Sequence, residues 1–207
     1  MLKVVVSQRV DWVETRAETR DALDQRLVDW LLQVGVLAVP VPNLLQSQGE
    51  LFPWIESIAP HAVVLSGGND IGSCPARDAT ETVLLDYAAE HDLPLLGICR
   101  GMQMMACHAG AALQPVQGHA ATRHPLRVSA TVNGGLPTEV NSYHDWALDG
   151  CPVGYEIIAS ASDGTVEAIR HRNRPWEGWM WHPEREALYS ATDIERARRV
   201  LQGESSL

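Results

Sequence analysis

The first half of the chain alternates between unbroken apolar runs and amphipathic stretches. The apolar runs predict strands over residues 2–7, 36–41, 61–65 and 93–98. The amphipathic stretches predict helices over residues 19–34, 80–91 and 101–109. Gly35 and Gly110 are placed to end the first and the last of these helices. Apolar strands that alternate with helices are typical of a parallel sheet covered on both faces, so we expect an α/β fold.

The pattern changes after Ala111, where Gly, Pro and Thr become more frequent and the apolar runs shorten. Alternating runs over residues 127–132, 156–161 and 166–170 predict an antiparallel extension of the same sheet. A last helix is expected over residues 193–201. Because no repeat, low-complexity tract or long linker interrupts the chain, we predict one domain covering residues 1–207.

Length and composition fit this picture. A chain of 207 residues with 45% apolar and 20% charged residues can bury one full core. The formal net charge of -10 argues against a nucleic-acid partner, because no basic patch offsets it cheaply. Two or three arginines would still suffice to bind a small phosphorylated ligand.

The sequence also bears on compartment and cofactors. No run approaches the roughly 18 apolar residues that span a bilayer, and the N-terminus becomes polar too early for a signal peptide. The four cysteines show no metal-ligand spacing, so we expect reduced thiols in a cytoplasmic protein. We predict no cofactor, no metal site and no membrane partner.

The strongest chemical signal is the segment around Cys99. A predicted buried strand ends there and a predicted helix begins, with Gly97 and Gly101 two residues to either side. This is the nucleophile-elbow pattern with Cys in place of Ser. The helix N-terminus favours a thiolate, and the N–H of Arg100 would point to where an oxyanion forms. An isolated Cys is more often a buried structural residue, and the other three cysteines keep that interpretation.

A nucleophilic Cys needs a base, and the base needs a group that orients it. His182 follows a short apolar run and is followed by Pro183 and Glu184. On an extended chain residues two apart face the same way, so Glu184 can reach the His182 ring. A lone His is more often structural, but its place in this pattern favours a catalytic role.

Three segments together resemble class I glutamine amidotransferases and their hydrolase relatives: Leu-Ser-Gly-Gly-Asn-Asp at 65–70, Gly-Ile-Cys-Arg-Gly-Met-Gln at 97–103, and Trp-His-Pro-Glu at 181–184. The resemblance implies a flavodoxin-like fold with a mostly parallel central sheet flanked by helices. It implies Cys99 as nucleophile, His182 as base and Glu184 as its orienting group. The Gly67–Gly68 backbone and the Arg100 N–H would form the oxyanion hole, and Gln103 would lie beside the bound glutamyl group.

Two features separate branches of that family. Asn69 and Asp70 stand where glutaminase subunits of synthetases usually have Pro after Ser-Gly-Gly. Residues 140–144 are similar to the Asn-Ser-x-His of free-standing γ-glutamyl hydrolases. That resemblance implies a glutamyl-binding loop, and the substrate-binding candidates on these segments are Gly67, Asn69, Gln103, Asn141, Ser142, Tyr143 and His144.

A further likeness is to γ-glutamyl-CDP-amidate hydrolases of capsule biosynthesis. It lies in residues 7–9, 18–20, 23–24, 166–171, 179–182 and 185–186. It implies hydrolysis of a γ-glutamyl-CDP-amidate to glutamate and cytidine diphosphoramidate. Arg9 and Arg20 are then candidate phosphate contacts, as is the Arg100 side chain. The alternative for each is an ordinary ion pair with a nearby acid.

Other functions stay open at this point. The chain would be a glutaminase subunit if it delivered ammonia to a synthetase partner. It would be a γ-glutamyl-polyamine-type hydrolase if its leaving group were a cationic amine, which suits the acidic chain. An idle binding module is disfavoured by the intact Cys, His and Glu. The expected partner is a small-molecule γ-glutamyl amide, and whether the chain forms a homodimer is left open.

Overall fold

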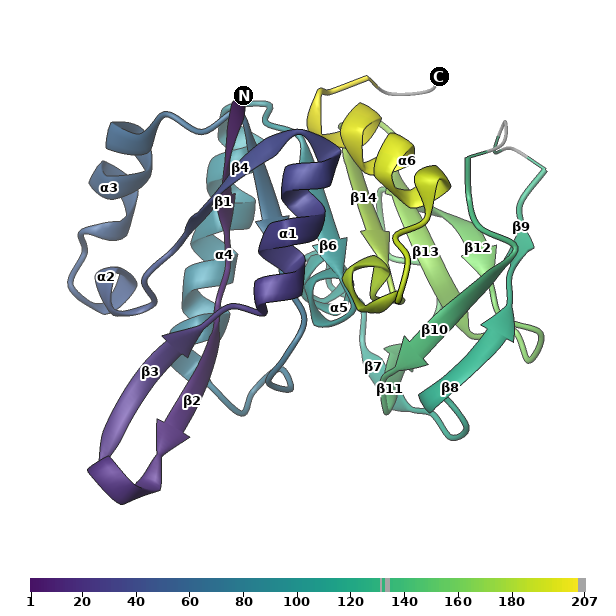
Figure 1. Ribbon diagram of the computed structural model, residues 1–207, viewed down its shortest axis with the longest axis horizontal. Coiled ribbons are helices and arrows are strands. Elements are labelled where there is room, and N and C mark those ends of the chain that lie inside the picture. The colour runs from purple at the N-terminus through teal and green to yellow at the C-terminus, as the bar shows by residue number, and fades with distance from the viewer. Residues whose placement is uncertain (131, 133–134, 205–207) are drawn as a thin grey trace.

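A computed structural model describes residues 1–130, 132 and 135–204, and in that part of the chain eight strands form the main sheet (Figure 1). The strand order is β4 (Val36–Pro40), β1 (Leu2–Val6), β5 (Ala62–Leu65), β6 (Leu95–Ile98), β14 (Trp176–Trp179), β13 (Val166–His171), β12 (Tyr155–Ser160) and β9 (Arg127–Val128). The first five are parallel and the last three continue antiparallel. The predicted parallel sheet and its antiparallel extension are therefore confirmed.

Helices cover both faces of this sheet. They are α1 (Gln25–Val34), α2 (Leu44–Ser47), α3 (Leu51–Ile58), α4 (Pro75–Glu90), α5 (Arg100–His108) and α6 (Ala191–Leu201). Alternate residues of a strand face opposite sides. Val4 and Val6 accordingly pack with α1 and α6, whereas Val5 packs with α3, α4 and α5. No helix in the described residues is long and apolar enough to cross a membrane.

Three two-stranded ribbons complete the described architecture. They are β2 (Arg9–Val13) with β3 (Glu18–Ala22), β8 (Ala120–Pro125) with β10 (Glu139–Tyr143), and β7 (Leu113–Pro115) with β11 (Trp146–Leu148). The β2–β3 hairpin projects from the end of β1 beyond the main sheet (Figure 1). The other two ribbons lie beside the antiparallel half of the sheet (Figure 1).

The first predicted helix begins later than its hydrophobic pattern indicated. Residues 19–22, predicted as helical, belong to β3 and pair with β2. The helix starts only at Gln25, because the Asp24 side chain accepts the N–H of Arg26 and caps it. Gly35 ends it with φ 99°, as predicted.

Other boundaries and elements also differ from the prediction. Helix α4 starts at Pro75 rather than at residue 80, because proline at the first helical position lacks only an N–H that would be unpaired there. Helices α2 and α3 lie in a segment where no element was predicted. Of the predicted run 127–132 only β9 is a strand, and residue 131 lies outside the described residues.

Candidate active site

Cys99 forms a sharp turn between β6 and α5, as the elbow pattern predicts. Its backbone has φ 50° and ψ -107°, its N–H donates to the carbonyl of Trp179 at 2.7 Å, and it is 7% exposed. A non-glycine residue with positive φ costs about 1–3 kcal/mol and persists where the surrounding structure imposes it. Gly101 lets the start of α5 pack closely against the end of β5, because a Cβ there would lie 2.1 Å from the carbonyl oxygen of Leu65. The strained turn presents the thiol at the carboxyl end of the sheet.

His182 and Glu184 form the second part of the site. His182 Nδ1 lies 2.7 Å from Glu184 Oε1, and both side chains are buried. The predicted contact is present, but a 3₁₀ turn over Pro183–Arg185 brings the two together rather than an extended chain. Asn141 holds His182 in place, because its amide accepts the His182 N–H at 2.9 Å and donates to the His182 carbonyl at 2.8 Å.

The charges around His182 favour its protonated form. Burial lowers the pKa of His182, but the charge of Cys99, a hydrogen bond with Cys99 and the contact with Glu184 together raise it to about 9. The raised pKa reflects the close approach of the Cys99 and His182 side chains. A protonated imidazole beside the candidate nucleophile can donate its proton to a leaving group.

The Gly67–Gly68 segment follows β5 and lies against the same histidine. A Cβ on Gly67 would lie 2.6 Å from Cε1 of His182, so only glycine fits there. Gly68 has φ 114°. Arg100 is the first residue of α5, and an N–H at that position has no partner within the helix. The structure thus brings the elbow, the His182 ring and the glycine segment together.

Two buried charged residues that sequence analysis missed support the glycine segment. Arg77 donates to the carbonyls of Ser66 and Gly67 at 2.7 and 3.0 Å, and pairs with Glu81 at 3.0 Å. Glu81 and Asp78 also pair with the Arg100 guanidinium. Arg100 therefore follows the ion-pair alternative rather than the phosphate one. The feature of the sequence that could have revealed this pair is the i, i+4 spacing of Arg77 and Glu81 on an otherwise apolar helix face.

Comparison with known proteins places this geometry in a family. Residues 5–184 match the Peptidase C26 family. The chain belongs to that family. The predicted likeness to class I glutamine amidotransferases is thereby confirmed.

Individual relatives of this C26 chain differ in what they do. Its sequence is 34% identical over 131 residues to the γ-glutamyl-CDP-amidate hydrolase of Campylobacter jejuni, covering 60% of this chain and 62% of that protein. The match thus spans less than two thirds of that relative. It is 28% identical over 183 residues to a glutamine-hydrolysing GMP synthase subunit of Thermococcus kodakarensis, covering 84% and 90% of the two chains. A Thermoplasma acidophilum crystal structure described as a GMP synthase subunit superposes with a TM-score of 0.73 at 27% identity, covering 97% and 92%.

Several predicted substrate residues of this C26 chain have structural partners. Asn69 accepts the N–H of Val10 at 2.8 Å and donates to its carbonyl at 2.9 Å, which attaches β2 to the glycine segment. Gln103 donates to the carbonyl of Trp146 at 3.0 Å. Ser142 is fully buried and donates to the carbonyl of His119 at 2.6 Å. Each of these three side chains thus binds a backbone group of another segment around the site.

Tyr143 is the outward-facing member of the predicted glutamyl loop. It is 44% exposed, and its ring centre lies 5.8 Å from that of His182 in an edge-on contact. The Arg185 guanidinium lies 4.8 Å from the centre of the Tyr143 ring. Sequence analysis did not assign Arg185 to the site, although it directly follows Glu184. In contrast, the His144 ring faces Glu167 and the carbonyl of Trp146, away from solvent.

Arg9 and Arg20 both lie on the β2–β3 hairpin. Arg9 pairs with Asp11 at 2.8 Å and Arg20 with Glu18 at 2.5 Å, and both side chains are half-exposed. Arg9 is also a neighbour of the glycine segment, because a Cβ on Gly68 would lie 2.9 Å from the Arg9 Cβ. Both arginines have the ion pairs of the alternative interpretation, and Arg9 in addition borders the site.

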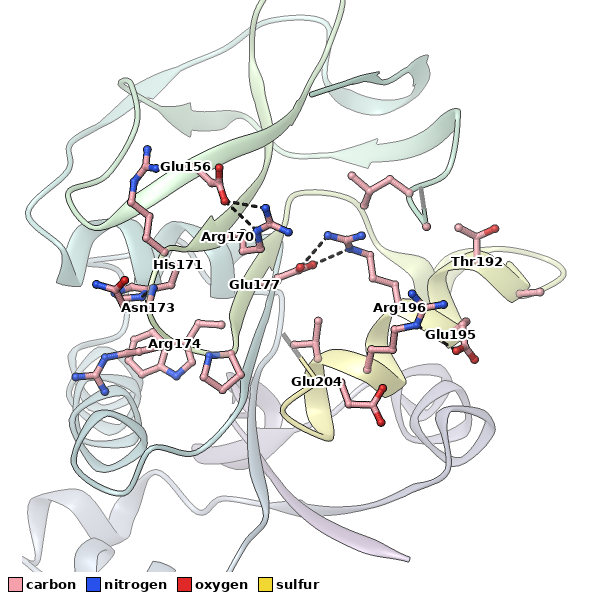
Figure 2. Close-up of a pocket in the computed structure, with 18 residues that line it drawn as sticks. Glu156, Arg170, His171, Asn173, Arg174, Glu177, Thr192, Glu195, Arg196 and Glu204 are labelled. Carbon is pink, nitrogen blue, oxygen red and sulfur yellow. Dashed lines mark hydrogen bonds and ion pairs between the residues drawn. The ribbon is translucent and has the colours of Figure 1, made fainter. Parts of the chain in front are cut away.

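A cavity of about 960 Å³ lies elsewhere, between β13, β14 and α6 (Figure 2). The ion pairs Glu156–Arg170 and Glu177–Arg196 stand in its wall (Figure 2). Cys99, His182 and Glu184 are absent from the residues that line it. The reactive constellation, rather than cavity size, therefore identifies the candidate active site.

Proposed function

We propose that this chain hydrolyses a γ-glutamyl amide bond through a thioester on Cys99. The observation that carries the proposal is the turn at Cys99, whose side chain meets a buried imidazole oriented by Glu184. A nucleophile, a base and an orienting group in this order constitute the machinery of acyl transfer.

The reaction follows from the positions of these groups. The Cys99 sulfur attacks the γ-carbonyl carbon, and the N–H groups of Gly68 and Arg100 stabilise the oxyanion. His182 gives its proton to the leaving nitrogen, the C–N bond breaks, and a thioester forms. His182 then takes a proton from water, whose oxygen attacks the thioester carbon. The bond between the thioester carbon and the Cys99 sulfur breaks, glutamate leaves, and Cys99 and the protonated His182 are regenerated.

The substrate that we favour is a γ-glutamyl-CDP-amidate, which would place the chain in capsule modification in the cytoplasm. The similarity to the Campylobacter enzyme supports this choice. So does the hairpin, because Asn69 attaches it to the glycine segment and Arg9 borders that segment. A guanidinium at this border matches phosphate oxygens of a nucleotide leaving group, if it exchanges Asp11 for them. Tyr143 and Arg185 would face the glutamyl group across His182.

A second candidate is a glutaminase that delivers ammonia to a synthetase partner. The similarity to the GMP synthase subunits, which extends over most of both chains, supports it. A γ-glutamyl polyamine remains a rival substrate, because the net charge of -10 suits a cationic amine.

The test is glutamate release from glutamine, a γ-glutamyl polyamine and γ-glutamyl-CDP-amidate, side by side. We expect the highest kcat/KM with the nucleotide amidate. The Cys99→Ala variant should lose more than about 1,000-fold in kcat. Cys151→Ala is the matched control, since that thiol is free and exposed. Retained activity in Cys99→Ala would overturn the mechanism, whereas a preference for another substrate would overturn only the choice of leaving group.

A further inference from the structure

Four potential metal ligands from three parts of the chain meet behind the predicted glutamyl loop. They are His119 before β8, His124 in β8, His144 between β10 and β11, and Glu167 in β13. One ligand atom from each lies within 4.8 Å of all the others. Glu167 is completely buried, His119 and His144 are each 4% exposed, and His124 is half-buried. Their separation along the chain follows no metal-binding spacing, which is why the sequence predicted none.

The three distances from Glu167 to the histidines of this cluster match the edge length of a coordination tetrahedron. Glu167 Oε1 lies 3.3 Å from His119 Nδ1, 3.4 Å from His124 Nε2 and 3.5 Å from His144 Nε2. Zinc binds nitrogen and oxygen at about 2.0–2.2 Å, so ligand atoms around a tetrahedral ion are roughly 3.3–3.5 Å apart. Hydrogen-bonded partners would be expected at about 2.7–3.0 Å.

The outer nitrogen of each histidine faces an oxygen acceptor. His119 Nε2 lies 3.0 Å from Asp163 Oδ2, His144 Nδ1 lies 3.0 Å from the carbonyl of Trp146, and His124 Nδ1 lies 3.4 Å from the carbonyl of Pro125. An outer N–H that donates to oxygen leaves a lone pair on the inner nitrogen. This is the arrangement that orients histidines around metals.

The atoms of the cluster that face one another have few hydrogen-bond partners. Among the described residues, both carboxylate oxygens of Glu167 and the Nε2 atoms of His124 and His144 are buried without a hydrogen-bond partner. The lone pairs of the three inner histidine nitrogens would repel one another and the buried Glu167 carboxylate. A divalent cation between these four groups removes that repulsion.

We propose that His119, His124, His144 and Glu167 bind one divalent transition-metal ion, preferentially zinc. Imidazole and carboxylate ligands in a tetrahedron suit zinc more than calcium or magnesium, which prefer oxygen ligands at higher coordination number. Four protein ligands close the coordination sphere, so the site is structural. It joins β8, β13 and the loop after β10, one residue from Tyr143, which contacts His182.

The test starts from purified Cys99→Ala, so that the thiol of the candidate active site cannot bind the metal. We expect about one zinc per chain by elemental analysis. After removal with a chelator, Co²⁺ should restore one equivalent and give the intense visible bands of tetrahedral cobalt, without sulfur-to-cobalt charge transfer. Rebinding of zinc at about 1,000 times Kd should raise Tm by about 10 °C.

Substitutions in the same background distinguish this site from incidental metal binding. Glu167→Gln should abolish the cobalt spectrum, and Asp163→Asn should weaken affinity about 10–100-fold by releasing His119. His61→Ala is the control, because His61 is exposed and outside the cluster. A parent chain that gains neither the cobalt bands nor thermal stability overturns the proposal, whether or not Glu167→Gln folds. Unchanged cobalt affinity in folded Glu167→Gln also overturns it.

Discussion

His182 interacts with Cys99 and with Glu184, and these interactions raise the pKa at which it loses its proton. Because its pKa is raised to about 9, the imidazole stays protonated through the neutral range and becomes neutral only above that pH. The proposed reaction uses this proton for the leaving nitrogen. We therefore expect kcat/KM to be constant near neutral pH and to fall above about pH 9, as a pH–rate profile would measure.

Interactions with Cys99 raise the pKa of His182 most, and the further contribution of Glu184 can be tested by substitution. Its carboxylate contacts His182 at 2.7 Å, and Arg185 is the neighbouring cation, 3.8 Å from the same oxygen. Removing the carboxylate in Glu184→Gln should move the alkaline limb down by about one pH unit or more. Glu195→Gln, on the exposed face of α6, should leave the profile unchanged. An unmoved limb in Glu184→Gln would refute the assignment of this limb to His182.

Gly67 is a second residue whose effect is local. A Cβ there would lie 2.6 Å from His182 Cε1, and the ring cannot yield freely because Glu184 holds the ring and Asn141 holds the His182 backbone. Gly67→Ala should displace the imidazole by a few tenths of an ångström or more and lower kcat on the order of 100-fold. Gly110→Ala is the control, because it has open space and a positive φ. It should cost about 1 kcal/mol of stability and no activity.

Among the secondary elements, the β2–β3 hairpin depends on a few side chains that anchor it. Asn69 makes two hydrogen bonds to Val10, and Asp21 accepts the N–H and the amide of Asn43 at 2.9 and 2.7 Å. Asn69→Ala should loosen residues 9–22 and lower the unfolding free energy by about 1–3 kcal/mol. Hydrogen exchange should speed up in this hairpin and not in β6. Ser73→Ala, which removes only a local bond to Asp70, should leave exchange unchanged.

The same hairpin shows why elements were predictable only in part. Residues 19–22 lead directly into the apolar stripe of α1 with no Gly or Pro between them, so the local sequence favoured helix. Their pairing with β2 is a tertiary effect. The parallel strands were predictable because burial on both faces leaves unbroken apolar runs. Helices α2 and α3 were missed because Pro42, Gly49 and Pro53 interrupt the pattern that would indicate them.

The candidate site, like the secondary elements, was predictable only in part. Cys99, His182 and Glu184 were predictable because each lies in a short motif whose chemistry follows from neighbours in sequence. Cys99 and His182 are 83 positions apart in the sequence, so their contact could be seen only in the folded structure. The histidine cluster around Glu167 was not predictable, since its members come from three distant parts of the chain that meet only in the fold: β8 with the residue before it, the loop after β10, and β13.

Across the whole molecule, a buried charged cluster joins the carboxyl ends of three central strands. Ser7 after β1 donates to Glu81 at 2.7 Å, Arg77 pairs with Glu81 and donates to Ser66 after β5, and Arg100 after β6 pairs with Glu81. Arg77 and Glu81 are completely buried. Burial lowers the pKa of Arg77, and the charge of Glu81 offsets part of that effect. Within the described residues, Glu81 is therefore the anion that both guanidinium groups and the end of β1 share.

Removal of that shared anion should affect the molecule as a whole. Glu81→Gln leaves two buried guanidinium groups with reduced compensation, and breaking a buried ion pair this way costs about 3–5 kcal/mol. We expect Tm to fall by about 10 °C and the urea midpoint to fall with an unchanged slope. Glu90→Gln, exposed at the end of the same helix, should change stability by less than about 0.5 kcal/mol. Equal stabilities of the two variants would mean that the strand ends are held by packing alone, because the cluster would then contribute nothing that a neutral amide cannot supply.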